Sequence, residues 1–224
     1  MNQIDQSILD HLRELDSATV FNAMAEVEGY ANEDYTGPEI RYLLPEMGAI
    51  IGYAVTVEAT PLDPTPPDLS WDTFYDYLAD LTGPIVTVFK DVDSRPNRAA
   101  IFGDGMAHLQ KALGVVGAVV DGCVRDLDGI RAAGLPTFGR GLVPGHGPFH
   151  VRGFKGRVTV GQVTVNNGEL LFGDTDGIVK IPADKAEDIL VAAQKIRDKE
   201  RTYFDLCDAP DFDYSKVKAW KESS

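Results

Sequence analysis

The sequence predicts a single mixed α/β domain, because short β-branched runs alternate with helical segments along the chain. The 224 residues suit one domain with a full core better than two small domains. Apolar residues make up 44% of the chain and charged residues 25%, which is the balance of a soluble globular protein. These observations indicate the fold class, whereas the strand order does not follow from the residues alone.

The N-terminal part is expected to be helical. Apolar residues at helical spacing predict a first helix over residues 3–15. Ser17 can cap a second helix over residues 18–28, which Gly29 ends. The mixture of Tyr, Asn, Gly, Pro and acidic residues that follows predicts a loop up to residue 47.

The remainder of the chain alternates between strands and helices. Runs rich in Val and Ile predict strands over residues 49–60, 84–89, 99–102, 115–120, 136–139, 157–165 and 170–180. Helical patterns predict helices over residues 69–81, 106–113, 127–133 and 183–206. Four prolines exclude regular structure from the loop 61–68. We therefore expect one domain over residues 1–208, with helices in 1–48, and a C-terminal tail over 209–224 that packs on a neighbour or frays.

The net charge of −14 argues against nucleic acid or an anionic membrane as a partner, because both require a basic face. A small anionic substrate is compatible with this charge, since one arginine and a metal ion can invert the local field. Two cysteines, Cys123 and Cys207, lack paired spacing, so we expect no structural disulfide and a cytoplasmic location. No apolar run reaches the length of a membrane span, and the first ten residues lack the pattern of a signal peptide.

One stretch, residues 103–126, joins a short helix to a strand and holds the candidate site residues. A helix of about ten residues runs ~15 Å. A strand of about six residues returns ~20 Å. Antiparallel packing of the two therefore brings the end of the strand back to the start of the helix. Asp104, at the helix start, is expected to lie close to Arg125 and Asp126, which follow the strand.

These side chains suit a metal ion and a small carboxylate. The two acids offer hard oxygens for Mg²⁺ or Mn²⁺, with water filling the remaining positions. At the helix start, carboxylate-binding N–H groups are expected on Gly105, Met106 and Ala107. Arg125 adds forked donors for the same anion. A 2-oxo acid carries a carboxylate beside a carbonyl that the metal can polarise, so this substrate class is expected.

The spacing of these residues is similar to a family signature. Asp104, twenty further residues and then Arg125-Asp126 resemble the Asp-X20-Arg-Asp pattern of class II 4-hydroxy-4-methyl-2-oxoglutarate aldolases in the RraA-like family. The likeness extends over residues 50–197. It implies a layered β/β/α swivelling-domain fold, assembled as homotrimers or hexamers with sites at subunit interfaces. It also implies that Glu200 lends a carboxylate to the metal of a neighbouring subunit.

The function that the resemblance implies is a metal-dependent lyase that releases pyruvate from a 4-hydroxy-2-oxo acid by retro-aldol cleavage. Oxaloacetate decarboxylation is a second expected activity, because both reactions pass through the pyruvate enolate. Asp126 is expected to bind the metal directly, Asp104 to hold its waters, and Arg125 to hold the pyruvyl group. The proton-transfer group stays open between a metal-linked water, Asp121 and Glu200.

Parts of the sequence are compatible with functions other than an aldolase. The family contains a non-catalytic regulator that binds a ribonuclease, and the acidity of this chain would suit a basic protein surface. Methyl transfer to a quinone has been attached to relatives by name, but the first strand is not followed by a glycine-rich nucleotide loop. His146 and His150 are four residues apart, yet the glycines and proline around them exclude the helix that a zinc pair would need. A loop histidine near the substrate is the alternative.

Overall fold

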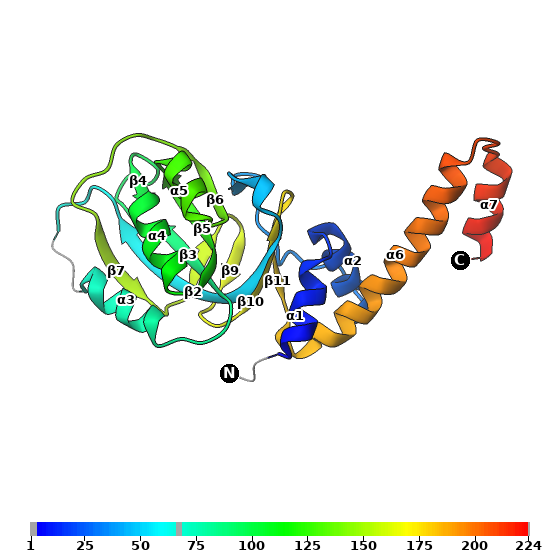
Figure 1. The fold of residues 1–224 in the computed structure, drawn as a ribbon, viewed down its shortest axis with the longest axis horizontal. Helices are drawn as coiled ribbons and strands as arrows, with labels where there is room; N and C mark the ends of the chain where they lie inside the picture. Colours follow the sequence, from blue (N-terminus) through cyan, green and yellow to red (C-terminus); the bar gives the residue numbers. More distant parts are fainter. Residues whose placement is uncertain (1–3, 66–68, 224) are drawn as a thin grey trace.

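A mixed nine-stranded sheet forms the body of the protein. The computed structural model describes residues 4–65 and 69–223. The strand order is β1-β6-β5-β3-β2-β10-β11, with β4 beside β5 and β7 beside β2 (Figure 1). The strands are β1 (Arg41–Tyr42), β2 (Ile50–Thr60), β3 (Ile85–Asp91), β4 (Ala100–Phe102), β5 (Val115–Val124), β6 (Thr137–Leu142), β7 (His150–Phe154), β10 (Leu170–Asp174) and β11 (Gly177–Ile181). The central strands β2, β3, β5 and β6 are parallel, so their carboxyl ends meet at one edge.

Helices cover one face of this sheet and a small second sheet covers the other. The helical layer consists of α3 (Trp71–Ala79), α4 (Asp104–Ala112) and α5 (Leu127–Ala133). Phe74, Ala107 and Ile130 of these helices are fully buried in a common cluster with strand residues. The opposite face is covered by the hairpin of β8 (Val158–Val160) and β9 (Val163–Val165). The expected single domain with layered β/β/α architecture is confirmed.

A second group of helices packs on the sheet at β2, β10 and β11. They are α1 (Gln6–Arg13), α2 (Ser17–Glu28) and α6 (Ala186–Asp208). Both predicted N-terminal helices are confirmed, with one change at the cap. Asp16, rather than Ser17, caps α2, since its carboxylate accepts the Thr19 N–H at 2.7 Å. Gly29 ends α2 in the left-handed conformation (φ 79°), as its position predicts.

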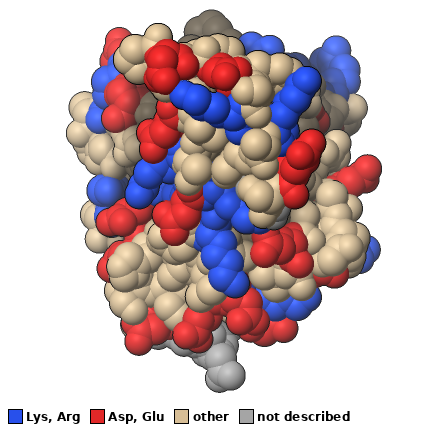
Figure 2. All heavy atoms as spheres, turned by 90° about the vertical axis from the view of Figure 1, so that its right-hand side faces the viewer, with Lys and Arg blue, Asp and Glu red and all other residues tan. Residues whose placement is uncertain are grey.

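The C-terminal part of the chain projects from the body. The outer half of α6 extends away from the sheet, and α7 (Tyr214–Ser223) folds back along it (Figure 1). Val217 of α7 is 2% exposed, and the Trp220 ring lies 5.6 Å from the Tyr203 ring of α6. The segment 209–224 therefore does not fray, because α7 buries apolar side chains against α6, whereas its packing on a neighbouring copy stays a prediction. Viewed from the α6–α7 side, acidic and basic side chains are interspersed over the surface (Figure 2).

Two boundaries near the candidate site differ from the predicted ones. The helix α4 begins at Asp104, two residues early, because Gly103 supplies the extended residue that precedes it. The strand β5 runs on to Val124, because Cys123 and Val124 pair with β4 and β6. Asp121 therefore lies within the sheet and not at its end.

Some short elements escaped prediction because their sequences carry too little periodicity. They are β1, β7 and the 3₁₀ turns Pro45–Met47 and Ala183–Lys185. In the proline-rich loop, residues 66–68 lie outside the described residues. Within the described part of the chain, no helix has both the length and the hydropathy required to cross a membrane.

Candidate active site

The carboxyl end of β5 brings three predicted site residues to one place. Arg125 and Asp126 follow β5, and the Arg125 N–H donates to the Phe102 carbonyl at 3.0 Å, which holds this end of β5 beside β4. Gly103 lies against both side chains, since a Cβ there would sit 3.2 Å from Asp126 Oδ2 and 3.4 Å from Arg125 Nε. Asp104 comes next and begins α4. The two acids and the arginine thus converge, as the helix–strand geometry predicts.

Asp126 has a backbone conformation that keeps its carboxylate free of the helix that follows. Its φ of 58° and ψ of 43° lie in the left-handed region, which Asp tolerates better than most residues. Asp126 occupies the N-cap position of α5, yet its side chain makes no capping hydrogen bond. Its Oδ2 lies 3.1 Å from Arg125 Nε instead, and 40% of its side chain is exposed. A carboxylate with access to solvent is therefore held beside the arginine.

The start of α4 offers fewer N–H groups than predicted. Gly105 N–H donates to Asp104 Oδ1 at 2.7 Å, and Ala107 N–H donates to the Gly103 carbonyl at 3.1 Å. No acceptor among the described residues takes the Met106 N–H. Because α4 starts two residues early, its first turn is already closed at Ala107. Of the three predicted anion donors, Met106 N–H is the one available to a ligand.

Close packing between α4 and α5 fixes Asp104. A Cβ added at Gly129 of α5 would lie 2.5 Å from Asp104 Oδ2 and 2.6 Å from Asp104 Cβ. We expect Gly129→Ala to lower the free energy of unfolding by about 1–2 kcal/mol, because this overlap outweighs the helical preference of alanine. Gly105→Ala is the matched control, since a Cβ there meets nothing within 4 Å and should stabilise α4 by up to ~1 kcal/mol. Urea unfolding measures the free energy of unfolding of both variants. Equal stabilisation by Gly129→Ala and Gly105→Ala would contradict the close contact between Gly129 and Asp104.

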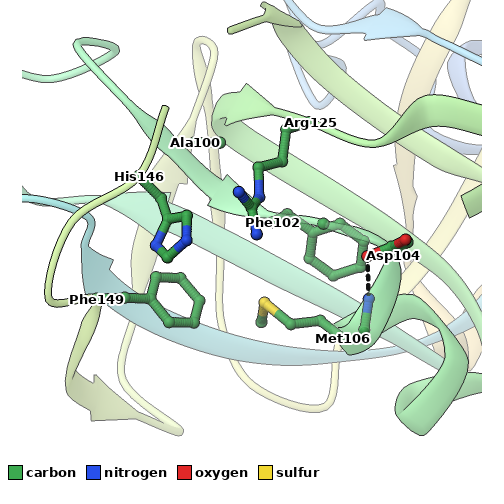
Figure 3. Close-up of a pocket in the computed structure, with 9 residues that line it drawn as sticks. Ala100, Phe102, Asp104, Met106, Arg125, His146 and Phe149 are labelled. Atoms are coloured by element: carbon green, nitrogen blue, oxygen red, sulfur yellow. Dashed lines mark hydrogen bonds between the residues drawn. The ribbon is translucent and has the colours of Figure 1, made fainter. Parts of the chain in front are cut away.

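A cavity of about 170 Å³ opens beside these residues (Figure 3). The Arg125 guanidinium points into the space in front of His146, Phe149 and Met106, and Asp104 lies at its side. The lining consists of Ala100, Phe102, Gly103, Asp104, Gly105, Met106, Arg125, His146 and Phe149. Of these, Ala100, Phe102 and Phe149 were not predicted. Ala100 and Phe102 belong to the short strand β4 and Phe149 to the glycine-rich loop, and neither sequence signals which cavity its side chains line. The suggestion of a loop histidine near the substrate fits the place of His146.

Asp121 does not line this cavity. Its side chain is 1% exposed and points to the β8–β9 hairpin, on the opposite sheet face from α4. Lys90 Nζ and Gly161 N–H donate to Asp121 Oδ2 at 2.7 and 3.1 Å, and Arg140 Nε donates to Oδ1. The catalytic role expected of Asp121 thus has no support in the structure. The strand β5 continues past Asp121, whose side chain lies on the sheet face opposite α4, so the catalytic role expected of it stays a prediction.

The chain itself supplies two acids for a metal. Among residues 4–65 and 69–223, no three His, Cys, Asp or Glu side chains are grouped so that they could hold an ion. Asp104 and Asp126 are hard oxygen donors of the kind that Mg²⁺ and Mn²⁺ bind with several waters, so they fit such an ion. Glu200 lies on the outer half of α6, away from the cavity of its own chain.

A buried acid holds the loops behind the cavity. Arg98 Nε and Nη2 donate to the two oxygens of Asp93 at 2.7 and 3.0 Å, and the Thr60 hydroxyl donates to Oδ2 at 2.8 Å. Burial opposes ionisation of Asp93, but these bonds outweigh it and lower its pKa below the usual range. The adjoining Pro61 carbonyl accepts the N–H groups of Gly147 and Phe149. The Asp93 network therefore supports one wall of the cavity.

Cys123 lies on β5 near Asp91 and carries no sign of reactivity. Burial, and then the Asp91 carboxylate, raise the pKa of its thiol. A thiol in such surroundings stays protonated and is a poor nucleophile. The interpretation of Cys123 as a small buried residue is therefore retained. Both Cys123 and Cys207 are free thiols.

Residues 17–180 match the family described as RraA-like: Aldolase/RraA. The chain belongs to the RraA-like family. An uncharacterized protein of Methanocaldococcus jannaschii is 30% identical over 164 residues, which cover 72% of this chain and 74% of that protein. The resemblance to the RraA-like family is thereby confirmed.

Two further comparisons bear on function and fold. A Halalkalibacterium halodurans protein named "Putative 4-hydroxy-4-methyl-2-oxoglutarate aldolase" is 35% identical over 102 residues, or 43% of this RraA-like chain. The match spans 46% of that relative, somewhat less than half its length. Streptomyces coelicolor RraAS2, described as an unusual member of the RNase ES inhibitor RraA family, has a TM-score of 0.73 at 23% identity. That likeness covers 89% of this chain and 98% of RraAS2, and it shows a shared fold.

Proposed function

We propose that this RraA-like protein is a divalent-metal-dependent pyruvate aldolase. It would cleave a 4-hydroxy-2-oxo acid, such as 4-hydroxy-4-methyl-2-oxoglutarate, into pyruvate and a second carbonyl compound. The observation that carries the proposal is the convergence of Asp104, Arg125 and Asp126 beside a cavity of small-molecule size. The aldolase names of relatives support the same reaction class.

The two acids would hold Mg²⁺ or Mn²⁺, Asp126 directly and Asp104 through water. The carboxylate of Asp126 is suited to this role because it is solvent-accessible and not used as a helix cap. When bound, the ion supplies a Lewis acid that polarises the 2-oxo group of the substrate.

Arg125 would bind and orient the pyruvyl half of the substrate. Its Nε faces Asp126, which leaves the terminal Nη groups directed into the cavity. A guanidinium binds a carboxylate through two parallel N–H bonds, and its charge stabilises the negative charge that develops on the pyruvyl oxygens as the C3–C4 bond breaks. The Met106 N–H at the start of α4 adds one further donor. Oxaloacetate decarboxylation would use the same groups, because it also generates pyruvate enolate.

The assembly is proposed as a homotrimer or hexamer in the cytoplasm. Glu200 projects with α6 beyond its own sheet, so its carboxylate would complete the site of a neighbouring copy. Two free thiols are compatible with a reducing compartment. The oligomeric state is measurable by light scattering.

Exchange of the pyruvate methyl protons with deuterium tests the enolate chemistry without any second product. We expect exchange with Mg²⁺ or Mn²⁺, loss of exchange with a chelator, and a fall of about 10²-fold for Asp126→Asn. Calorimetric titration of Mn²⁺ should show weaker binding by the variant. Asp128→Asn is the matched control, because Asp128 is a fully exposed acid two residues away and should retain normal exchange. Exchange that persists in the chelator would rule out metal dependence.

A non-catalytic regulator is the second candidate. The description of RraAS2 as a member of a ribonuclease-inhibitor family, together with the charge of −14 here, favours a test for a basic protein partner. Capture of a ribonuclease without pyruvate exchange or turnover of any 2-oxo acid would establish that function in place of the aldolase.

A further inference from the structure

We infer that His146 is the general base that removes the proton from the C4 hydroxyl of the substrate. This inference rests on the proposed aldolase function and adds to it a group that acts on the half leaving as the second carbonyl compound. Asp104, Arg125 and Asp126 are assigned to the metal and the pyruvyl half. His146 comes from a separate part of the chain, the loop between β6 and β7.

Retro-aldol cleavage requires the C4 hydroxyl to lose its proton. As the proton passes to a base, the oxygen forms a carbonyl with C4, the C3–C4 bond breaks, and its electron pair moves to C3 as the pyruvate enolate. The enolate then takes up one proton at C3 and becomes pyruvate, so the reaction consumes no oxidant, reductant or further reactant. The base has to lie beyond C3, away from the group that binds the pyruvyl carboxylate.

The place of His146 in the cavity meets this requirement. Its ring lines the cavity and projects into the space in front of the Arg125 guanidinium (Figure 3). A substrate whose carboxylate is bound by Arg125 extends its C4 atom toward the imidazole. The Phe149 ring stands edge-on to the His146 ring, with centroids 6.5 Å apart and planes at 76°, and packs beside it in the same lining.

A contact with its own loop selects the tautomer of His146 that a base needs. Nδ1 of the ring lies 3.0 Å from the Gly147 carbonyl oxygen. Because a carbonyl oxygen can only accept a hydrogen bond, Nδ1 carries the proton and donates it. In the neutral ring Nε2 then has no proton and offers its lone pair. This second nitrogen lies on the Arg125 side of the ring, toward the cavity (Figure 3).

The backbone on both sides of His146 is anchored. The Ala100 N–H donates to the Gly145 carbonyl at 2.8 Å, and the Gly147 N–H donates to the Pro61 carbonyl at 3.0 Å. Gly147 is also closely packed, since a Cβ there would lie 2.8 Å from the Pro61 carbonyl oxygen. The His146 side chain itself is exposed. An imidazole on a fixed backbone, open to solvent, can meet a substrate and return its proton to water.

Other ionisable groups of the site act on a different half of the substrate. Asp104 Oδ1 accepts the Gly105 N–H, and Asp104 is proposed to hold the waters of the metal. Glu200 of a neighbouring copy is proposed to reach the same ion. Loss of either acid should therefore impair every reaction that passes through the enolate. Loss of a base for the C4 hydroxyl should impair only the reaction in which that hydroxyl is deprotonated, so the two roles are separable.

Three reactions of one protein test the inference. Pyruvate methyl exchange and oxaloacetate decarboxylation pass through the enolate without a C4 hydroxyl, whereas cleavage of 4-hydroxy-4-methyl-2-oxoglutarate requires its deprotonation. We expect His146→Ala to lower kcat/KM for cleavage about 10²–10³-fold and to leave the other two rates within about threefold of wild type. His146→Gln stays polar but cannot take up the proton, so it should lose cleavage equally.

A matched variant and a metal titration complete the test. His108→Ala removes an exposed histidine of α4 that does not line the cavity, and it should cleave normally. Calorimetric titration should give the same Mn²⁺ affinity for His146→Ala as for wild type. Weaker Mn²⁺ binding would make His146 a metal ligand and overturn the inference.

Two further results would also overturn it, namely cleavage retained in both His146 variants and a parallel loss of all three reactions. Pyruvate exchange by the wild-type protein would in each case leave the aldolase proposal standing. A wild-type protein that neither exchanges the pyruvate methyl protons nor cleaves the substrate would overturn the aldolase proposal itself.

Discussion

Arg125→Ala is expected to slow pyruvate methyl exchange by about 10²–10³-fold, the usual effect of removing a donor that stabilises developing negative charge. The side chain is about one-third exposed, and its ion partner Asp126 is more exposed still. Such a pair contributes at most ~1 kcal/mol to folding, so the free energy of unfolding should change little. Deuterium exchange followed by NMR, beside urea unfolding, measures both quantities.

Two variants sharpen this prediction. Arg125→Lys keeps the positive charge but loses the paired N–H donors of the guanidinium. Its rate of pyruvate exchange should therefore lie between those of wild type and Arg125→Ala. Arg131→Ala removes an arginine of similar exposure on α5, which pairs with Glu46 and does not line the cavity, and it should exchange normally. An equal loss in both alanine variants would mean that the effect is general electrostatics and not a contact with the substrate.

Asp121→Asn is expected to lower the free energy of unfolding by about 3 kcal/mol. The side chain of Asp121 is 1% exposed and compensates both Lys90 and Arg140, whose charges the asparagine cannot match. Because these two cations are about 30% exposed, part of the cost is relieved by solvent, which places the effect at the lower end for a broken buried pair. Thermal or urea unfolding provides the measurement.

The same variant separates a structural role from a catalytic one. Pyruvate exchange per folded molecule should remain within about threefold of wild type, because Asp121 lies on the sheet face opposite α4. A variant with normal stability and lost exchange would instead support the proton-transfer role first expected of Asp121. Asp128→Asn, at a fully exposed acid, controls for loss of charge alone.

Much of the fold was predictable because its elements carry strong local patterns. Helices such as α2 and α5 have both an apolar face and a glycine that ends them, at Gly29 and Gly134. The strand order depends on which strands pair across long sequence separations. The local sequence of a strand does not indicate its partner. The length of β5 was underestimated because the Asp121-Gly122 sequence resembles a turn. Ion pairs with Lys90 and Arg140, on the sheet face opposite α4, instead stabilise Asp121 within the strand.

The candidate site was predictable where it is local in sequence. Asp104, Arg125 and Asp126 are joined by one helix and one strand, whose lengths alone bring their ends together. Phe149 could not be placed in the same way, because it comes from a loop fixed by distant contacts with Trp71 and Pro61. The free N–H groups were overcounted because a shift of two residues in the helix start decides which donors are already used.

The αL turn at Asp126 and the strained backbone of Phe149 belong to separate stretches of the chain, about twenty residues apart. One stretch carries the groups proposed for the metal and the enolate, and the other contributes His146 and Phe149 to the lining of the cavity. Substitutions in the second stretch can therefore alter substrate choice while the groups proposed to stabilise the enolate are inherited unchanged. Such a division would allow one ancestral scaffold to diversify among 2-oxo acids by loop changes alone.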